Sequence, residues 1–76
     1  MWSAEDFDVD LYTRRVMHKD SGIWFGWHDD YDQVRWEKSD AVFYHDIPDW
    51  SGDRLALARA AKSAAIAKGM KSYAGL

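Results

Sequence analysis

The chain has 76 residues, a net charge of −3 and no cysteine, so we expect one small domain without disulfides or thiolate metal sites. Aromatic residues make up 16% of the sequence, and their large rings supply burial that so short a chain otherwise lacks. We find neither an apolar run long enough to span a membrane nor a basic-then-apolar leader, and therefore expect a cytoplasmic protein.

The charges are distributed unevenly along the chain. Residues 1–53 contain all 13 acids and five bases, a net charge of −8, whereas residues 54–76 contain five bases and no acid. The chain thus joins an acidic first part to a basic last part. Because nucleic-acid binders are more often basic overall, this sign argues against that class of protein.

The first predicted strand covers residues 6–11 and continues through the β-compatible residues 12–18. Acidic and apolar residues alternate in its first half, which is the period of a half-buried strand. The apolar members face the core in this interpretation: Phe7, Val9 and Leu11. The acidic members form a row on the outer face: Asp6, Asp8 and Asp10. Because aspartate is a poor strand former, an extended lead-in is the alternative.

A second predicted strand follows a turn at residues 19–22, which read Lys-Asp-Ser-Gly. This strand covers residues 23–28 and is apolar on both faces, with Trp24 opposite its other large side chains. We therefore place it centrally in the sheet. Gly26 leaves room there for a neighbouring ring or helix backbone.

The third and fourth predicted strands lie on either side of a turn at residues 38–40. Residues 33–37 form the third strand, with Val34 and Trp36 on one face, and residues 41–47 form the fourth. The two strands either form a hairpin or merge, which leaves three or four strands in the sheet. Pro48 then ends the sheet, because it has no N–H group for the ladder.

An alanine-rich helix is predicted over residues 52–68, with Ser51 as its N-cap and Asp53 in its first turn. Gly69 ends this helix, or the helix continues to Tyr73. Its small face packs on the sheet: Ala56, Leu57, Ala60, Ala64 and Ala67. A bulkier line either completes the core or carries self-association into a homodimer: Leu55, Ile66, Met70 and Tyr73.

These elements predict an α+β fold, with an antiparallel sheet of three or four strands packed against one C-terminal helix. The whole chain, residues 1–76, forms one domain, in which residues 1–5 are a loose arm or a short turn.

Catalytic and metal-binding patterns are weak. The sequence contains no G-x-S-x-G, P-loop or H-E-x-x-H motif, so we expect no enzyme and no cofactor. Residues 28–32 offer oxygen ligands suited to Ca²⁺ or Mn²⁺, but they lack the glycine and glutamate of an EF-hand, which favours an acidic turn over a metal site. A triad of His18, His28 and His45 is a further metal candidate, against ordinary strand histidines.

The acidic row leads to the main functional prediction. Alternate strand residues lie about 6.6 Å apart on one face, a spacing similar to that of a nucleic-acid backbone. The row therefore either mimics DNA or RNA toward a basic partner or is a solvated strand face. We predict a non-enzymatic protein-binding module, a small acidic inhibitor or adaptor that docks on a nucleic-acid-binding protein. The predicted site contains Asp6, Asp8, Asp10, Asp29, Asp30 and Asp32, with Trp2 and Trp50 as exposed anchors.

Resemblances add an alternative. Residues 41–65, AVFYHDIPDWSGDRLALARAAKSAA, resemble the last strand and following helix of AP2-type and integrase arm-binding domains. This resemblance implies a sheet whose basic residues enter the DNA major groove. The alternative function is therefore a small DNA-binding domain, and direct nucleic-acid binding would use Arg14, Arg15, Arg35 and the helix lysines. Residues 33–48, QVRWEKSDAVFYHDIP, are similar to the hairpin-then-proline segment of KTSC-type domains. In size, acidity and lack of catalytic motifs the chain is also similar to phage-encoded inhibitors of host defence, such as anti-CRISPR proteins.

Overall fold

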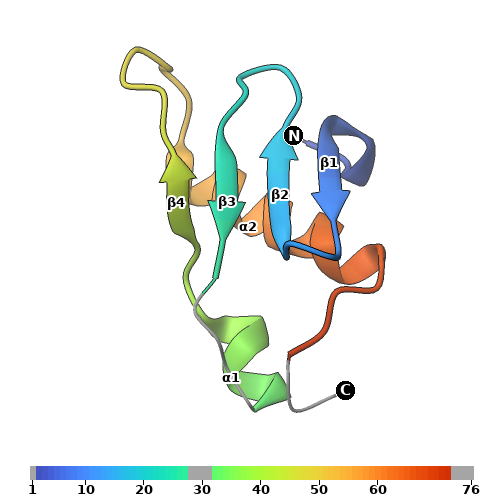
Figure 1. Cartoon of the computed structure of the whole chain (residues 1–76). Coiled ribbons are helices and arrows are strands. Elements are labelled where there is room, and N and C mark those ends of the chain that lie inside the picture. Colours follow the sequence, from blue (N-terminus) through green and yellow to red (C-terminus); the bar gives the residue numbers. More distant parts are fainter. Residues whose placement is uncertain (1, 28–31, 73–76) are drawn as a thin grey trace.

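The computed structural model describes residues 2–27 and 32–72 and has an α+β fold (Figure 1). Four antiparallel strands form a sheet in the order β1-β2-β3-β4, and the C-terminal helix α2 lies behind it. The elements are, in chain order, the 3₁₀ helix η1 (Ala4–Asp6), β1 (Phe7–Asp10), β2 (Arg15–His18), β3 (Trp24–Gly26), α1 (Gln33–Lys38), β4 (Val42–His45) and α2 (Arg54–Ala67). The predicted fold class is confirmed. Among these elements, no helix has the length and apolar character needed to cross a bilayer.

The first predicted strand is divided into the hairpin β1–β2, so the prediction of one continuous strand was wrong. The break occurs because the Asp10 carboxylate accepts the backbone N–H groups of Tyr12 (3.0 Å) and Thr13 (3.2 Å), which folds the chain into a turn. Arg14 completes the turn in the left-handed region, with φ of 58°. Leu11, expected in the core, lies in this turn and is 49% exposed.

The N-terminal segment is an ordered turn that packs on α2. Asp6 belongs to η1 and not to β1, and its carboxylate accepts the backbone N–H of Ser3 at 2.7 Å. The predicted acidic row therefore loses its first member, and only Asp8 and Asp10 lie on the strand.

The hairpin β2–β3 forms at the predicted turn. Two backbone hydrogen bonds close it, from His18 N to Ile23 O (2.9 Å) and from Gly22 N to His18 O (2.7 Å). As expected, β3 lies inside the sheet and a ring crosses Gly26. A Cβ atom at Gly26 would lie 1.7 Å from Cε2 of Tyr44, so the missing side chain is what lets this ring lie over β3.

The third predicted strand, residues 33–37, is the short helix α1, so that prediction was wrong. Asp32 caps the helix, because its carboxylate accepts the N–H groups of Val34 (2.9 Å) and Arg35 (3.2 Å). The helix turns Val34 outward, where it is 59% exposed, and buries Trp36. Helix α1 therefore separates β3 from β4 along the chain.

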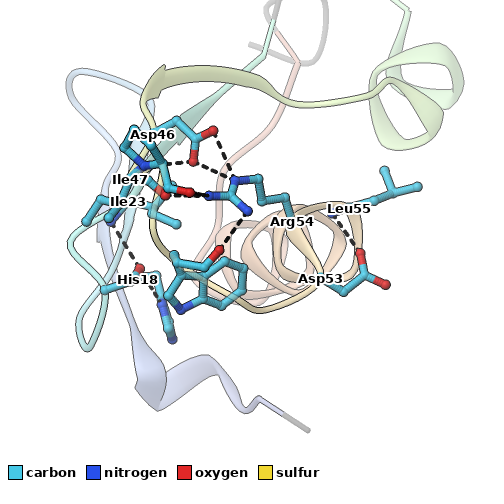
Figure 2. A network of polar contacts seen from close by, with 10 residues as sticks. His18, Ile23, Asp46, Ile47, Asp53, Arg54 and Leu55 are labelled. Carbon is cyan, nitrogen blue, oxygen red and sulfur yellow. Dashed lines mark hydrogen bonds and ion pairs between the residues drawn. The ribbon is translucent and has the colours of Figure 1, made fainter.

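Helix α2 begins two residues later than predicted, at Arg54, and ends at Ala67, one residue before the predicted end. Its N-cap is Asp53 and not Ser51, since the Asp53 carboxylate accepts the N–H of Leu55 (3.0 Å) and that of the next residue (Figure 2). At the other end Gly69 has φ of 100°, and Met70 N donates to Ala65 O at 2.9 Å, which forms a Schellman motif. The helix therefore does not continue to Tyr73, which lies outside the described residues.

The face of α2 that packs in the core is rotated from the predicted one. Its buried residues are Leu57, Ala58, Ala61, Lys62, Ala64 and Ala65. Of the predicted face, Ala56 and Ala60 are only partly buried and Ala67 is exposed. On these residues the helix packs beneath the rings of the core cluster, among them Phe7, Phe25, Trp27 and Trp36.

Lys62 explains the rotation of α2. Its ammonium group donates to Trp36 O, Ser39 O (3.0 Å) and Ser39 Oγ (2.9 Å), at the C-terminal end of α1. The same Nζ lies 4.9 Å from the ring centroid of Trp36 and 5.1 Å from that of Trp27. The buried ammonium group of Lys62 thus caps the C-terminal end of α1 and links α1 to α2.

The side chain of Arg54 stabilises the loop between β4 and α2. Its guanidinium forms a bidentate pair with Asp46, at 2.9 and 3.0 Å, and donates to the carbonyls of Ile47 and Trp50 (Figure 2). It also lies 5.6 Å from the ring centroid of Trp50. These contacts hold residues 46–50 over the first turn of α2.

Candidate functional site

One face of the sheet is uncovered. Helix α2 lies behind the strands, and no described element lies in front of them (Figure 1). The strand alternation and the cross-strand register place a defined set of side chains on this side. We call it the open face, and it consists of Asp8, Asp10, Arg15, Met17, Trp24 and Tyr44.

A shallow hollow of about 490 Å³ lies on the open face near β1. Asp8 and Asp10 line it from β1, and Trp24 lines it from β3. Met17 lies between these strands, paired with both Asp8 and Trp24. Carboxylates beside an indole ring suit a cationic side chain, because the charge pairs with the acid and its stem or head lies on the ring.

The two acids of the hollow differ in their bonding. The Asp10 carboxylate accepts N–H groups of its turn, and these bonds from Thr13, followed by weaker contributions that include the charge of Arg15, lower its pKa below 3.8. Asp10 is therefore ionised at neutral pH. The Asp8 carboxylate is exposed and makes no hydrogen bond or ion pair within residues 2–27 and 32–72, so its charge is available to a partner.

Arg15 and Tyr44 complete the open face beside the hollow. The Arg15 guanidinium lies 4.7 Å from the centroid of the Tyr44 ring, which crosses β3 over Gly26. Tyr44 is 51% exposed even so. The open face therefore combines exposed aromatic and methionine surface with charge, a composition enriched at protein interfaces.

The predicted acidic site is only partly assembled. Asp8 and Asp10 share the open face, whereas Asp6 binds the backbone in η1 and Asp32 caps α1. Asp29 and Asp30 lie outside the described residues. The charge of the open face thus comes from two acids and Arg15.

The two tryptophans expected as exposed anchors pack instead around a buried histidine. The ring centroids of Trp2 and Trp50 each lie 6.2 Å from that of His18, and Phe7 lies 5.4 Å from it. His18 Nδ1 lies 2.7 Å from Ser21 Oγ (Figure 2), while its buried Nε2 lies among these rings and has no hydrogen-bond partner in the described part of the chain. Both tryptophans are partly buried and stabilise the sheet edge near η1.

The basic residues of the alternative function lie in different environments. Arg14 donates to Lys71 O and stacks on Trp36, Arg15 lies on the open face, and the ammonium of Lys62 is buried. Arg35 is exposed on α1, 4.0 Å from Asp32. The geometry does not gather them into a basic groove.

The suggested histidine triad does not form from the residues described. His18 is buried and His45 is exposed on β4, while His28 lies outside the described residues. Within the described ranges no three His, Cys, Asp or Glu side chains are grouped as metal ligands.

The sequence analysis missed the aromatic part of the site. Neither Trp24 nor Tyr44 was among the predicted site residues, although Trp24 was expected opposite the other large side chains of its strand. That opposition was the available signal, because a central strand with one covered face must expose its other face.

Comparisons with known proteins found no match to a family model, a curated protein or a solved structure.

Proposed function

We propose that this chain is a non-enzymatic protein-binding module, a small acidic inhibitor or adaptor whose open face docks on a basic, nucleic-acid-binding protein. The observation that carries the proposal is the hollow in which the carboxylates of Asp8 and Asp10 lie beside Trp24. A lysine or arginine side chain of the partner enters this hollow, pairs with Asp8 and stacks on the indole ring.

The surrounding residues supply the apolar part of the interface. Met17 and Tyr44 lie next to the hollow and present thioether and ring surface. Tyrosine, tryptophan and methionine contribute contact area at interfaces, whereas exposed acids mainly steer association and select the partner. The partner is thus expected to combine a basic patch with an apolar centre.

To test this, the isotope-labelled protein is titrated at low salt with a decapeptide rich in lysine and arginine. NMR and calorimetry measure the binding. We expect chemical-shift changes at Asp8 and at the Trp24 indole. Asp8→Lys should weaken binding by roughly tenfold or more. Asp49→Lys is the matched control, because Asp49 is exposed in the loop before α2 and its reversal changes the net charge equally.

Capture from a nuclease-treated cell lysate then tests the class of partner. A nucleic-acid-binding protein retained by the wild type and by Asp49→Lys, but lost with Asp8→Lys and with folded Trp24→Ala, supports the proposal. Equal retention by all four proteins contradicts it. If duplex DNA binds instead, with affinity that falls steeply as salt is added, direct nucleic-acid binding replaces it.

A further inference from the structure

A second hollow lies beside α2 and shares no lining residue with the open face. It has a volume of about 360 Å³ and lies between α2 and residues 37–41, which are the end of α1 and the link from α1 to β4. Trp27 and Ala58 give it apolar walls, and Leu55 and Ile66 lie along it with 47% and 39% of their surface exposed. We call this the α2 groove. The two side chains lie on the same side of α2, about three helical turns apart, at the two ends of the groove.

The walls of the α2 groove carry opposite charges. The wall formed by residues 37–41 contributes Glu37 and Asp40, with Lys38 between them, a net charge of −1. The α2 wall contributes Arg59 and Lys62, but the ammonium of Lys62 is already bound to the end of α1. Arg59 is exposed and forms no ion pair with any described residue. One acidic wall thus faces one available cation.

The acidic wall leads directly into an unprotected strand edge. β4 is the last strand of the sheet, so one side of its backbone has no pairing partner among the described elements. The opposite edge strand, β1, carries Asp8 and Asp10, which discourage pairing, whereas β4 reads Val-Phe-Tyr-His and contains neither an acid nor a proline. Phe43 and Tyr44 are 39% and 51% exposed there.

We propose that a second copy of this chain covers the α2 groove and pairs antiparallel along β4, forming a two-fold symmetric dimer. In such a dimer each contact occurs twice, so the acidic wall of each copy meets Arg59 of the other. Two identical strands that pair antiparallel are also related by a two-fold axis. Pairing along the free β4 edge is therefore compatible with the symmetry of the same dimer. Leu55 and Ile66 are buried in the interface.

The experiment measures molar mass by light scattering and by sedimentation over a wide range of protein concentration. We expect a mass that rises from 8.8 kDa toward twice that value as concentration increases. Arg59→Glu alone and Glu37→Lys with Asp40→Lys should each weaken the dimer by roughly tenfold or more, because each places like charges opposite one another twice. Leu55→Asp should have the same effect. All four positions are exposed, so circular dichroism should show the wild-type fold.

Mixing the two charge variants gives the decisive result. Arg59→Glu retains an acidic wall, and the Glu37→Lys/Asp40→Lys protein retains Arg59, so both contacts of a mixed dimer are again between opposite charges. We expect the mixture to dimerise more tightly than either variant does alone. A wild type that stays monomeric at high concentration overturns the proposal, as does a dimer whose affinity the charge variants leave unchanged. Binding of the basic decapeptide at the open face is independent of both results.

Discussion

The buried ammonium of Lys62 is the contact on which the packing of α1 depends most directly. Lys62→Met retains the length and apolar stem of the side chain and removes only its charge and donors. The substitution leaves Ser39 O without its donor, while Trp36 O keeps the hydroxyl of Ser39 at 2.8 Å. It also removes the cation from the rings of Trp27 and Trp36.

The expected loss is the difference between two stabilising contributions of the ammonium and one unfavourable contribution. Hydrogen bonds to a charged donor contribute about 1.5–3 kcal/mol each, and each cation–ring contact contributes roughly 0.5–2 kcal/mol. Against these stands the desolvation of a buried ammonium, which costs several kcal/mol and is relieved by methionine. We expect a net loss of about 2 kcal/mol in the free energy of unfolding. For a domain of this size, this corresponds to a fall in Tm of about 8–16 °C.

Urea unfolding followed by tryptophan fluorescence measures the loss, and hydrogen exchange at the Ser39 amide reports whether α1 loosens. Lys68→Met is the matched control, because Lys68 carries the same side chain in an exposed position at the end of α2. This control should change stability by no more than about 0.5 kcal/mol. If Lys62→Met is as stable as the wild type, the ammonium does not contribute net stability and the reasoning fails.

Two further predictions concern helix capping and acid stability. Asp53→Ala should cost about 1 kcal/mol in thermal unfolding followed by circular dichroism, because it leaves the N–H groups of Leu55 and Ala56 without their acceptor. Ser51→Ala should have no measurable effect, and an equal loss from both would contradict the assignment of the cap. The folded protein holds the pKa of Asp10 below 3.8, so the stability that this carboxylate contributes is complete above that value and is lost as the pH falls through the folded pKa. Asp10→Asn should remove this pH-dependent part of the stability. Urea titrations of the wild type and the variant, at neutral and at strongly acidic pH, measure the difference. An identical pH dependence in both proteins would show that the turn does not depend on the ionised form of Asp10.

The local patterns of the sequence determined much of this protein. Glycine and its neighbours at residues 19–22 set the β2–β3 hairpin, the apolar faces of β3 placed it centrally, and Gly69 ended α2. Each of these features depends on backbone geometry or on side-chain periodicity within a few residues. The space left by Gly26 was also predicted from the sequence, although the ring that fills it was not identified.

The tertiary structure decided the state of residues 33–38 and the position of Lys62. A segment of six residues is too short to be a stable helix alone, and a buried Trp36 fits a strand as well as a helix. The cap at Asp32 and the ammonium of Lys62 satisfy opposite ends of α1, and only the folded chain brings Lys62 to the second end. For the same reason the sequence did not reveal that Trp2 and Trp50 enclose His18, while Trp24 and Tyr44 lie on the open face. Periodicity identifies which side chains share a side of one element, but the packing of other elements determines which side is covered.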